Sequence, residues 1–90
     1  MAIIVAGNLT IKSGLRDEFV AKSLEAVVLA RSNRSCEDFS VSPDPIDPKR
    51  VNIFEKWQSQ ADLDVFRDAG PETDVFSLVE SFDVHEYEIP

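Results

Sequence analysis

Glu55 and Trp57 are the residues whose types and spacing point most directly to chemistry. They lie two positions apart in a segment rich in β-branched and aromatic residues, so in a strand both side chains share one face. A buried carboxylate has a raised pKa and can accept a proton, and an indole can stack on an aromatic ring. The pair could therefore deprotonate an aromatic molecule. Two alternatives stay open: Glu55 could form an ion pair that fixes the strand end, and Trp57 could be a core aromatic.

His85 and Tyr87 form a second pair at strand spacing and share a face with Ile89. His85 is the one histidine of the chain, and an imidazole has an ordinary pKa near neutrality. Together with Tyr87 it could transfer protons, so His85 is a second candidate base. The alternative is a hydrogen-bonded structural role at the seam of a dimer.

Cys36, the single cysteine, could in principle be a nucleophile, but no histidine lies near it in sequence. We expect a small buried side chain instead. One cysteine and one histidine exclude an internal disulfide and the usual kinds of zinc site. Asp44 and Asp47 supply too few oxygen ligands for another metal ion, so we expect no metal.

The net charge of the chain excludes some classes of binding partner. Nine Lys and Arg against seventeen Asp and Glu give a net charge of −8, which repels nucleic-acid phosphates. The apolar N-terminal segment has no basic region before it and is far too short to cross a membrane. We expect a cytoplasmic protein, with neither nucleic acid nor membrane as partner. With 43% hydrophobic residues, we also expect one folded domain over residues 1–90.

Hydrophobic spacing and turn residues predict the elements that position these side chains. A strand over residues 2–11 is followed by a helix over 15–31 and by a strand from Glu37 to Ser42. The first helix has apolar residues at helical spacing, which we expect to face the core: Leu15, Phe19, Val20, Leu24, Val27 and Val28.

The second half of the chain begins with an exposed loop over residues 43–50, because its three prolines cannot pair in a central strand. A strand over 51–57 follows, with Val51, Ile53, Glu55 and Trp57 on one face. Ser59 and Asp62 resemble a capping box and open a second helix, which stops at Gly70-Pro71. Thr73 could cap a short turn, and alternation over 82–89 predicts the last strand.

The resulting order, β-α-β-β-α-β, is that of a ferredoxin-like α+β fold. It places both helices on one face of a four-stranded antiparallel sheet and leaves the other face bare. A domain of this size has a thin core, so an uncovered sheet face favours a homodimer that packs sheet against sheet.

Several short motifs follow one another over nearly the whole chain. Gly14 precedes a helix that bears Phe19 and has Ala30-Arg31-Ser32 near its end. Cys36-Glu37-Asp38-Phe39-Ser40-Val41 and Asp47-Pro48 then lead to Phe54-Glu55-Lys56-Trp57-Gln58-Ser59-Gln60-Ala61-Asp62-Leu63. In this order and spacing the motifs resemble the antibiotic biosynthesis monooxygenase family. The resemblance implies a dimeric α+β barrel. It also implies, as in several members, oxidation of quinols or polycyclic phenols by O2 without metal or flavin. Other relatives degrade haem or signal molecules.

Some positions depart from the family pattern. Asn33-Arg34-Ser35 stands where the family commonly has Glu-Pro-Gly, and Phe66 stands where the second helix often has a histidine. Of the Asn, Trp and His set of the haem-degrading branch, only Trp57 matches. Gly7 occupies the strand position of that asparagine, and Asn8 points to the other face. Haem degradation is therefore disfavoured.

The resemblance thus implies a cofactor-free monooxygenase acting on a quinol-like or polyphenolic molecule with O2. Glu55 or His85 would accept the proton and Trp57 would stack on the ring. Ile53, Phe66 and Tyr87 complete the expected substrate-binding set. Two other functions stay open: a non-catalytic dimeric binding or sensor module on the same scaffold, and an isomerase or decarboxylase acting on a β-dicarbonyl compound.

Overall fold

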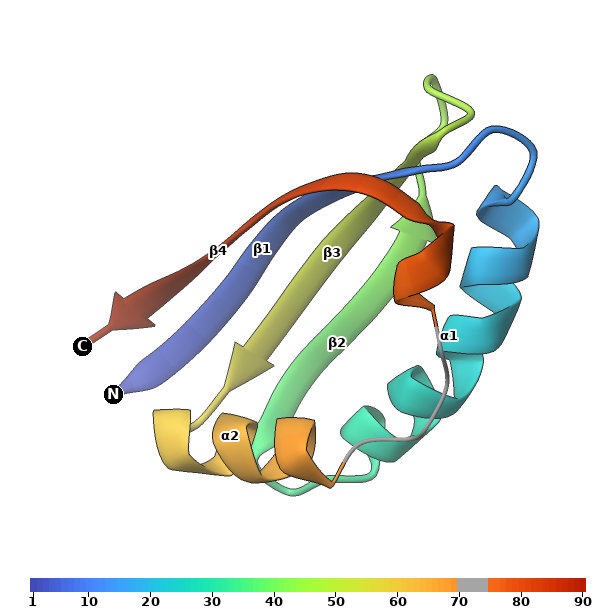
Figure 1. Cartoon of the computed structure of the whole chain (residues 1–90). Helices are drawn as coiled ribbons and strands as arrows, with labels where there is room; N and C mark the ends of the chain where they lie inside the picture. Colours follow the sequence, from blue (N-terminus) through green and yellow to red (C-terminus); the bar gives the residue numbers. More distant parts are fainter. Residues whose placement is uncertain (70–74) are drawn as a thin grey trace.

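Four strands and two α-helices follow one another in the order β-α-β-β-α-β in a computed structural model of the chain, which describes residues 1–69 and 75–90 (Figure 1). The predicted ferredoxin-like order is confirmed, and a short 3₁₀ helix, η1, lies where a short turn was expected before the last strand. The elements are β1 (Ala2–Ile11), α1 (Arg16–Arg31), β2 (Cys36–Pro43), β3 (Arg50–Trp57), α2 (Gln60–Asp68), η1 (Phe76–Leu78) and β4 (Val79–Ile89).

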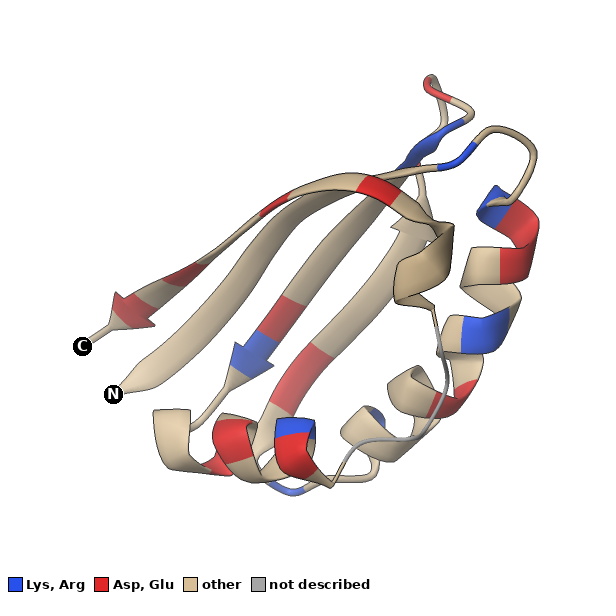
Figure 2. Ribbon diagram, in the orientation of Figure 1, with Lys and Arg blue, Asp and Glu red and all other residues tan. Residues whose placement is uncertain are grey.

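The strands form one antiparallel sheet in the order β2-β3-β1-β4. Helix α1 runs alongside β2, and α2 crosses the end of the sheet where β3 ends and β1 begins (Figure 1). Ala30 of α1 and Leu63 of α2 pack into one core cluster with Ile3 and Val5 of β1, so both helices cover the same face. Strand β1, one of the two central strands, carries no charged residue, whereas β2, β3 and β4 each carry two or more (Figure 2).

The strand register assigns every side chain to one of two faces, because residues directly opposite each other in an antiparallel pair point the same way. Val5 lies opposite Glu55 on β3 and opposite Glu86 on β4, and this row faces the helices. Ala6 lies opposite Phe54 and His85, and this row belongs to the uncovered face. Neighbouring rows along the sheet therefore face opposite directions.

Helix α1 differs from its expected packing at two positions. Leu24 and Val28 are 62% and 55% exposed, so their assignment to the core was wrong. The residues that face the sheet are Phe19, Ser23 and Ala30. Leu24 and Val28 lie about 100° around the helix from Ser23 and Val27, on the outer flank. Ser23 can replace an apolar residue in the core because its Oγ donates a hydrogen bond to the Phe19 carbonyl oxygen at 2.8 Å.

Helix α2 begins as predicted. The Oγ of Ser59, its N-cap residue, accepts a hydrogen bond from the Asp62 N–H at 3.2 Å. The Asp62 carboxylate in turn accepts hydrogen bonds from Ser59 and from Ser35, whose Oγ lies 2.6 Å from Oδ2. The hydrogen bond from Ser35 is the main reason that the pKa of Asp62 is lowered. The expected stop at Gly70-Pro71 and the expected cap at Thr73 lie outside the described residues.

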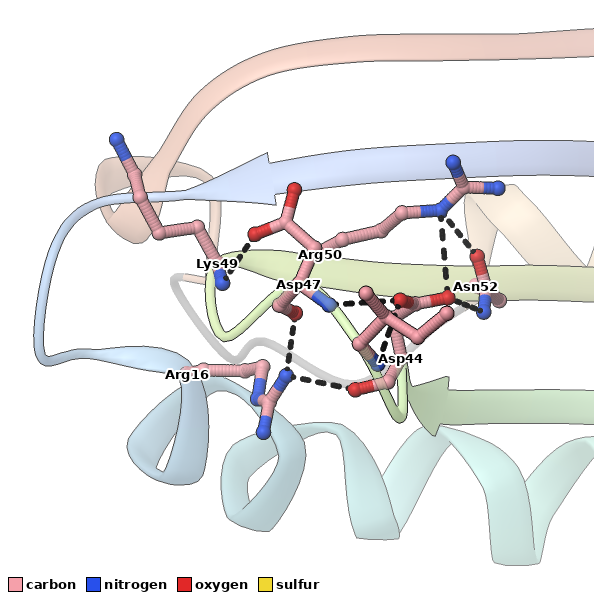
Figure 3. Close-up of polar contacts among 7 residues, drawn as sticks. Arg16, Asp44, Asp47, Lys49, Arg50 and Asn52 are labelled. Atoms are coloured by element: carbon pink, nitrogen blue, oxygen red, sulfur yellow. Dashed lines mark hydrogen bonds and ion pairs between the residues drawn. The ribbon is translucent and has the colours of Figure 1, made fainter.

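The loop between β2 and β3 is organised around one carboxylate (Figure 3). Asp44 Oδ2 accepts hydrogen bonds from the N–H groups of Ile46 and Asp47 at 3.0 and 2.9 Å, and Oδ1 accepts one from Asn52 at 2.9 Å. Arg16 donates from α1 to the carbonyl oxygens of Asp44 and Asp47 at 3.1 and 2.8 Å. The two acidic residues of this loop therefore stabilise the turn itself.

The hydrogen bonds to Asp44 predict how the free energy of unfolding depends on pH. The hydrogen bonds, led by that from the Asp47 N–H, lower the pKa of Asp44 from 3.8 to about 2. A carboxylate whose pKa is lower in the folded state stabilises the fold above its unfolded pKa and loses that contribution as the pH falls through its folded pKa. We expect Asp44→Asn to unfold more easily than the wild type in urea at pH 7. The difference should shrink as the pH falls from 3.8 to about 2. A difference that stays constant over this range would contradict the assignment.

Gly7, in the middle of β1, lies very close to β4. Its φ of +153° is rarely adopted by residues with a side chain, and a Cβ at this position would lie 2.0 Å from the Asp83 carbonyl oxygen. Only glycine therefore fits between these two strands without displacing backbone. The same geometry explains why an asparagine of the haem-degrading type has no place at this position.

Candidate active site

Glu55 lies on β3 on the helix-covered face, where it is partly buried. Its Oε1 accepts a hydrogen bond from the Trp57 indole Nε1 at 3.0 Å. The two residues meet because strand periodicity places positions 55 and 57 on one face. The structure thus brings together the pair that the sequence singles out, and the indole N–H fixes the orientation of the carboxylate.

Trp57 is fully buried, with 0% of its surface exposed. The Phe66 ring of α2 lies against it, with centroids 5.0 Å apart and planes tilted by 41°. Phe39 of β2 contacts Phe66 edge-on at 5.9 Å. The indole therefore presents no free face to a substrate ring, and the expected stacking on Trp57 is not possible in this arrangement. Phe66, which is only partly buried, is the aromatic ring of this cluster that a ligand could reach.

The pKa of Glu55 is raised above its ordinary value, and burial is the main cause. The neighbouring Glu86 carboxylate raises the pKa further, whereas the Trp57 hydrogen bond and the positive charge of Arg67 lower it. A raised pKa makes the carboxylate a stronger proton acceptor than an exposed glutamate.

This raised pKa predicts a pH-dependent penalty on stability. A carboxyl group with a higher pKa in the folded state favours folding below its unfolded value, here 4.5, and opposes it as the pH rises through the folded pKa. We expect Glu55→Gln to be more stable than the wild type at pH 8, because the amide carries no charge into the core. The advantage should vanish below pH 4.5. Urea denaturation of both proteins at pH 4 to 8 measures this difference. A stability gap that does not change with pH would contradict a raised pKa.

His85 and Tyr87 lie on the uncovered face, opposite Ala6 and Ile4 of β1. The His85 Nε2 is 2.6 Å from the Asp83 Oδ1, and both side chains are largely exposed. Because the sheet separates them from Glu55, His85 and Tyr87 do not share a site with it within one chain. The Asp83 partner of His85 was not predicted, although its spacing of two residues along a strand is itself a signal.

Two charged residues that lie in or against the strand row of Glu55 were also not predicted. Arg67 of α2 and Glu86 of β4 form an ion pair, with Nη1 and Oε1 3.4 Å apart. That Glu86 shares a row with Glu55 could have been found only from the strand register, which the sequence does not state.

The predicted residue Ile53 shares the face of Glu55 and is partly buried against the neighbouring core cluster.

The other candidate groups have structural roles. Cys36 is half-buried, its Sγ donates to the Asp38 carbonyl oxygen at 3.3 Å, and burial raises the pKa of its thiol, which opposes a nucleophilic thiolate. Over residues 1–69 and 75–90, no three His, Cys, Asp or Glu side chains are grouped to hold a metal ion. In the same ranges, no helix is both long and apolar enough to span a membrane.

Comparison with known proteins assigns the fold to a family. A sequence model of the antibiotic biosynthesis monooxygenase family matches residues 2–75. The chain belongs to this family. A solved structure of a Chloroflexus aurantiacus protein assigned to the antibiotic biosynthesis monooxygenases superposes with a TM-score of 0.78 at 25% identity, covering 97% of this chain and 91% of the other.

Two further proteins resemble the chain, one in its fold alone and one over part of its sequence. The Mycobacterium tuberculosis protein Rv0793 shares the fold, with a TM-score of 0.84 at 17% identity over 100% of this chain and 96% of its own. An uncharacterized protein of Synechocystis is 34% identical over 62 residues, which is 69% of this chain. The match covers 42% of that protein, so the chain spans less than half the length of this curated relative.

Proposed function

We propose that this member of the antibiotic biosynthesis monooxygenase family oxygenates a quinol-like or polyphenolic molecule with O2 and without a cofactor. The observation that carries the proposal is the partly buried Glu55 carboxylate, which accepts a hydrogen bond from the Trp57 indole and has a raised pKa. An electron-rich phenol needs only to lose its proton before its anion can reduce oxygen, so one positioned base in a poorly solvated site is sufficient.

Glu55 accepts the phenolic proton in this proposal. Trp57 does not touch the substrate but orients Glu55, and Phe66 with Ile53 contacts the aromatic ring. Support for Phe66 comes from its position over Trp57, 5.0 Å away between ring centroids, and its partial exposure. We place the substrate between α2 and β4, beside Phe66 and Val84, which are partly buried and pack against the core cluster.

Oxygen uptake with a panel of hydroquinones and anthrones tests the proposal. We expect consumption above the autoxidation blank with at least one of them, with product formation matching the oxygen used. No turnover with any compound would refute the oxygenase function. Thermal stabilisation by such a ligand without oxygen consumption would instead support the binding or sensor module. Formation of an isomer or CO2 from a β-dicarbonyl compound would support the third alternative.

We also propose that the chain forms a homodimer through its uncovered sheet face. The centre of this face is apolar, with Ile4, Ala6, Phe54 and Tyr87 in neighbouring rows, and Phe54 and Tyr87 are exposed in the single chain. A second copy would remove this surface from water. Light scattering should give twice the mass of 10.1 kDa. We expect Phe54→Glu to shift the mass toward the monomer, and an unchanged mass in this variant would contradict the assigned face.

A further inference from the structure

Three charged side chains converge above Val5 on the helix-covered face. Val5 lies opposite Glu55 on one side and Glu86 on the other, so the two carboxylates occupy one row of the sheet. Arg67 extends from α2 to Glu86, and Gln60 of the same helix also donates to the Glu86 Oε1 at 3.4 Å. Arg67 therefore places its positive charge against the row of the sheet that also holds Glu55, the proposed base.

The ion pair between Arg67 and Glu86 is loosely held. Its N–O separation of 3.4 Å is well above the roughly 2.7–2.9 Å of a tight charge-assisted hydrogen bond. Both side chains are 45% exposed, and exposed pairs of this kind contribute little to stability. Arg67 can therefore exchange Glu86 for another anionic oxygen at small cost.

Proton transfer to Glu55 creates such an oxygen. The phenolic O–H bond breaks, the proton passes to a Glu55 carboxylate oxygen, and the electron pair stays on the substrate oxygen. The negative charge thereby moves from Glu55 to the substrate, next to a neutral carboxylic acid. Arg67 already acts on the charge of Glu55, since its positive charge opposes the rise in that pKa. The positive charge of Arg67 would likewise stabilise a substrate anion formed beside Glu55.

We infer that Arg67 binds the deprotonated oxygen of the substrate, that Glu86 holds the guanidinium until then, and that the site selects acidic phenols. This inference rests on the proposed function, because it takes Glu55 as the base. It adds a specificity: phenols acidified by a carbonyl or other electron-withdrawing group would bind as anions. Aromatic molecules without an ionisable hydroxyl would gain nothing from Arg67.

Binding of 4-nitrophenol tests the inference, because its anion has a distinct visible absorbance and no oxygen chemistry is needed. We expect the wild type to lower the apparent pKa of the bound phenol by about one unit, the effect of a cation nearby. Arg67→Gln should abolish this shift, and Arg67→Lys should restore part of it. Glu86→Gln should increase the shift, because it frees Arg67. Lys49→Gln removes a cation from an exposed ion pair elsewhere, with Glu80, and should leave the shift unchanged.

The opposite signs of the Arg67 and Glu86 variants separate anion binding from a merely structural bridge. Both variants break the same contact, so a structural role would make them act alike, and that result would overturn the inference. Equal shifts in the wild type and Arg67→Gln, or no binding by the wild type, would overturn it as well. Oxygen uptake is measured independently. Turnover without an Arg67-dependent shift refutes only the role of Arg67, and a shift without turnover refutes only the oxygenation.

Discussion

Glu55→Gln is expected to reduce oxygen consumption with a hydroquinone or anthrone substrate by about 10²- to 10⁴-fold, the usual contribution of a general base. The amide has nearly the same size as the carboxylate and can still accept the hydrogen bond that Trp57 donates at 3.0 Å. It cannot accept a proton from the substrate. The variant thus removes the chemistry while it preserves the packing around β3.

The measurement is the initial rate of oxygen uptake at several substrate concentrations and pH values. The loss should lie in kcat, because ring contacts with Phe66 and Ile53 are unchanged. Glu80→Gln is the matched control: it removes one carboxylate, in an exposed pair with Lys49, and should retain full activity. Activity of Glu55→Gln within a few-fold of the wild type, in a folded protein, would exclude Glu55 as the base.

Gly7→Ala is expected to have the largest effect on stability. The added Cβ would meet the Asp83 carbonyl oxygen at 2.0 Å and the Val84 Cα at 2.8 Å, both of them backbone atoms that cannot rotate away. Relief requires β1 and β4 to separate in the middle of the sheet. Overpacking costs about 1–3 kcal/mol. The unusual φ adds a similar amount of strain, so we expect a total loss of about 2–6 kcal/mol.

Gly14→Ala is the control that separates the contact from the backbone conformation. Gly14 also has a positive φ, +79°, but no atom lies within 4 Å of the position of its missing Cβ. The free energy of unfolding of Gly14→Ala should fall by about 1–2 kcal/mol, because alanine is less stable than glycine in this backbone conformation. Urea denaturation followed by circular dichroism gives both values. An equal decrease in the free energy of unfolding of the two variants would show that β4 moves to accommodate a side chain at position 7.

Much of the fold could be predicted because local rules agree with the tertiary structure. The alternation of side-chain types and the break at Ser13-Gly14 predicted the first strand at the same residues as β1. The acidic residue three positions after Ser59 predicted the start of α2. Helix α1 was less predictable. Its apolar residues are too widely spread around the axis to define one face, and a buried serine takes a core position.

The candidate site was predictable only within a single strand. Residues two apart share a face, so the contact between Glu55 and Trp57 followed from spacing. Whether His85 joins them depends on the register between strands, and a shift of one residue reverses the answer. The register places Glu55 in the row of Val5 and His85 in the row of Ala6. Long-range partners such as Arg67 leave no local trace in the sequence.

Trp57 is the single tryptophan of the chain, and its indole N–H is bonded to the proposed base. The tryptophan fluorescence of the protein therefore comes from one indole in one defined environment. Protonation of Glu55 changes the acceptor of the indole, and a ligand that moves Phe66 changes the ring packed against it. Emission spectra can thus follow both events in the unlabelled, unmodified protein.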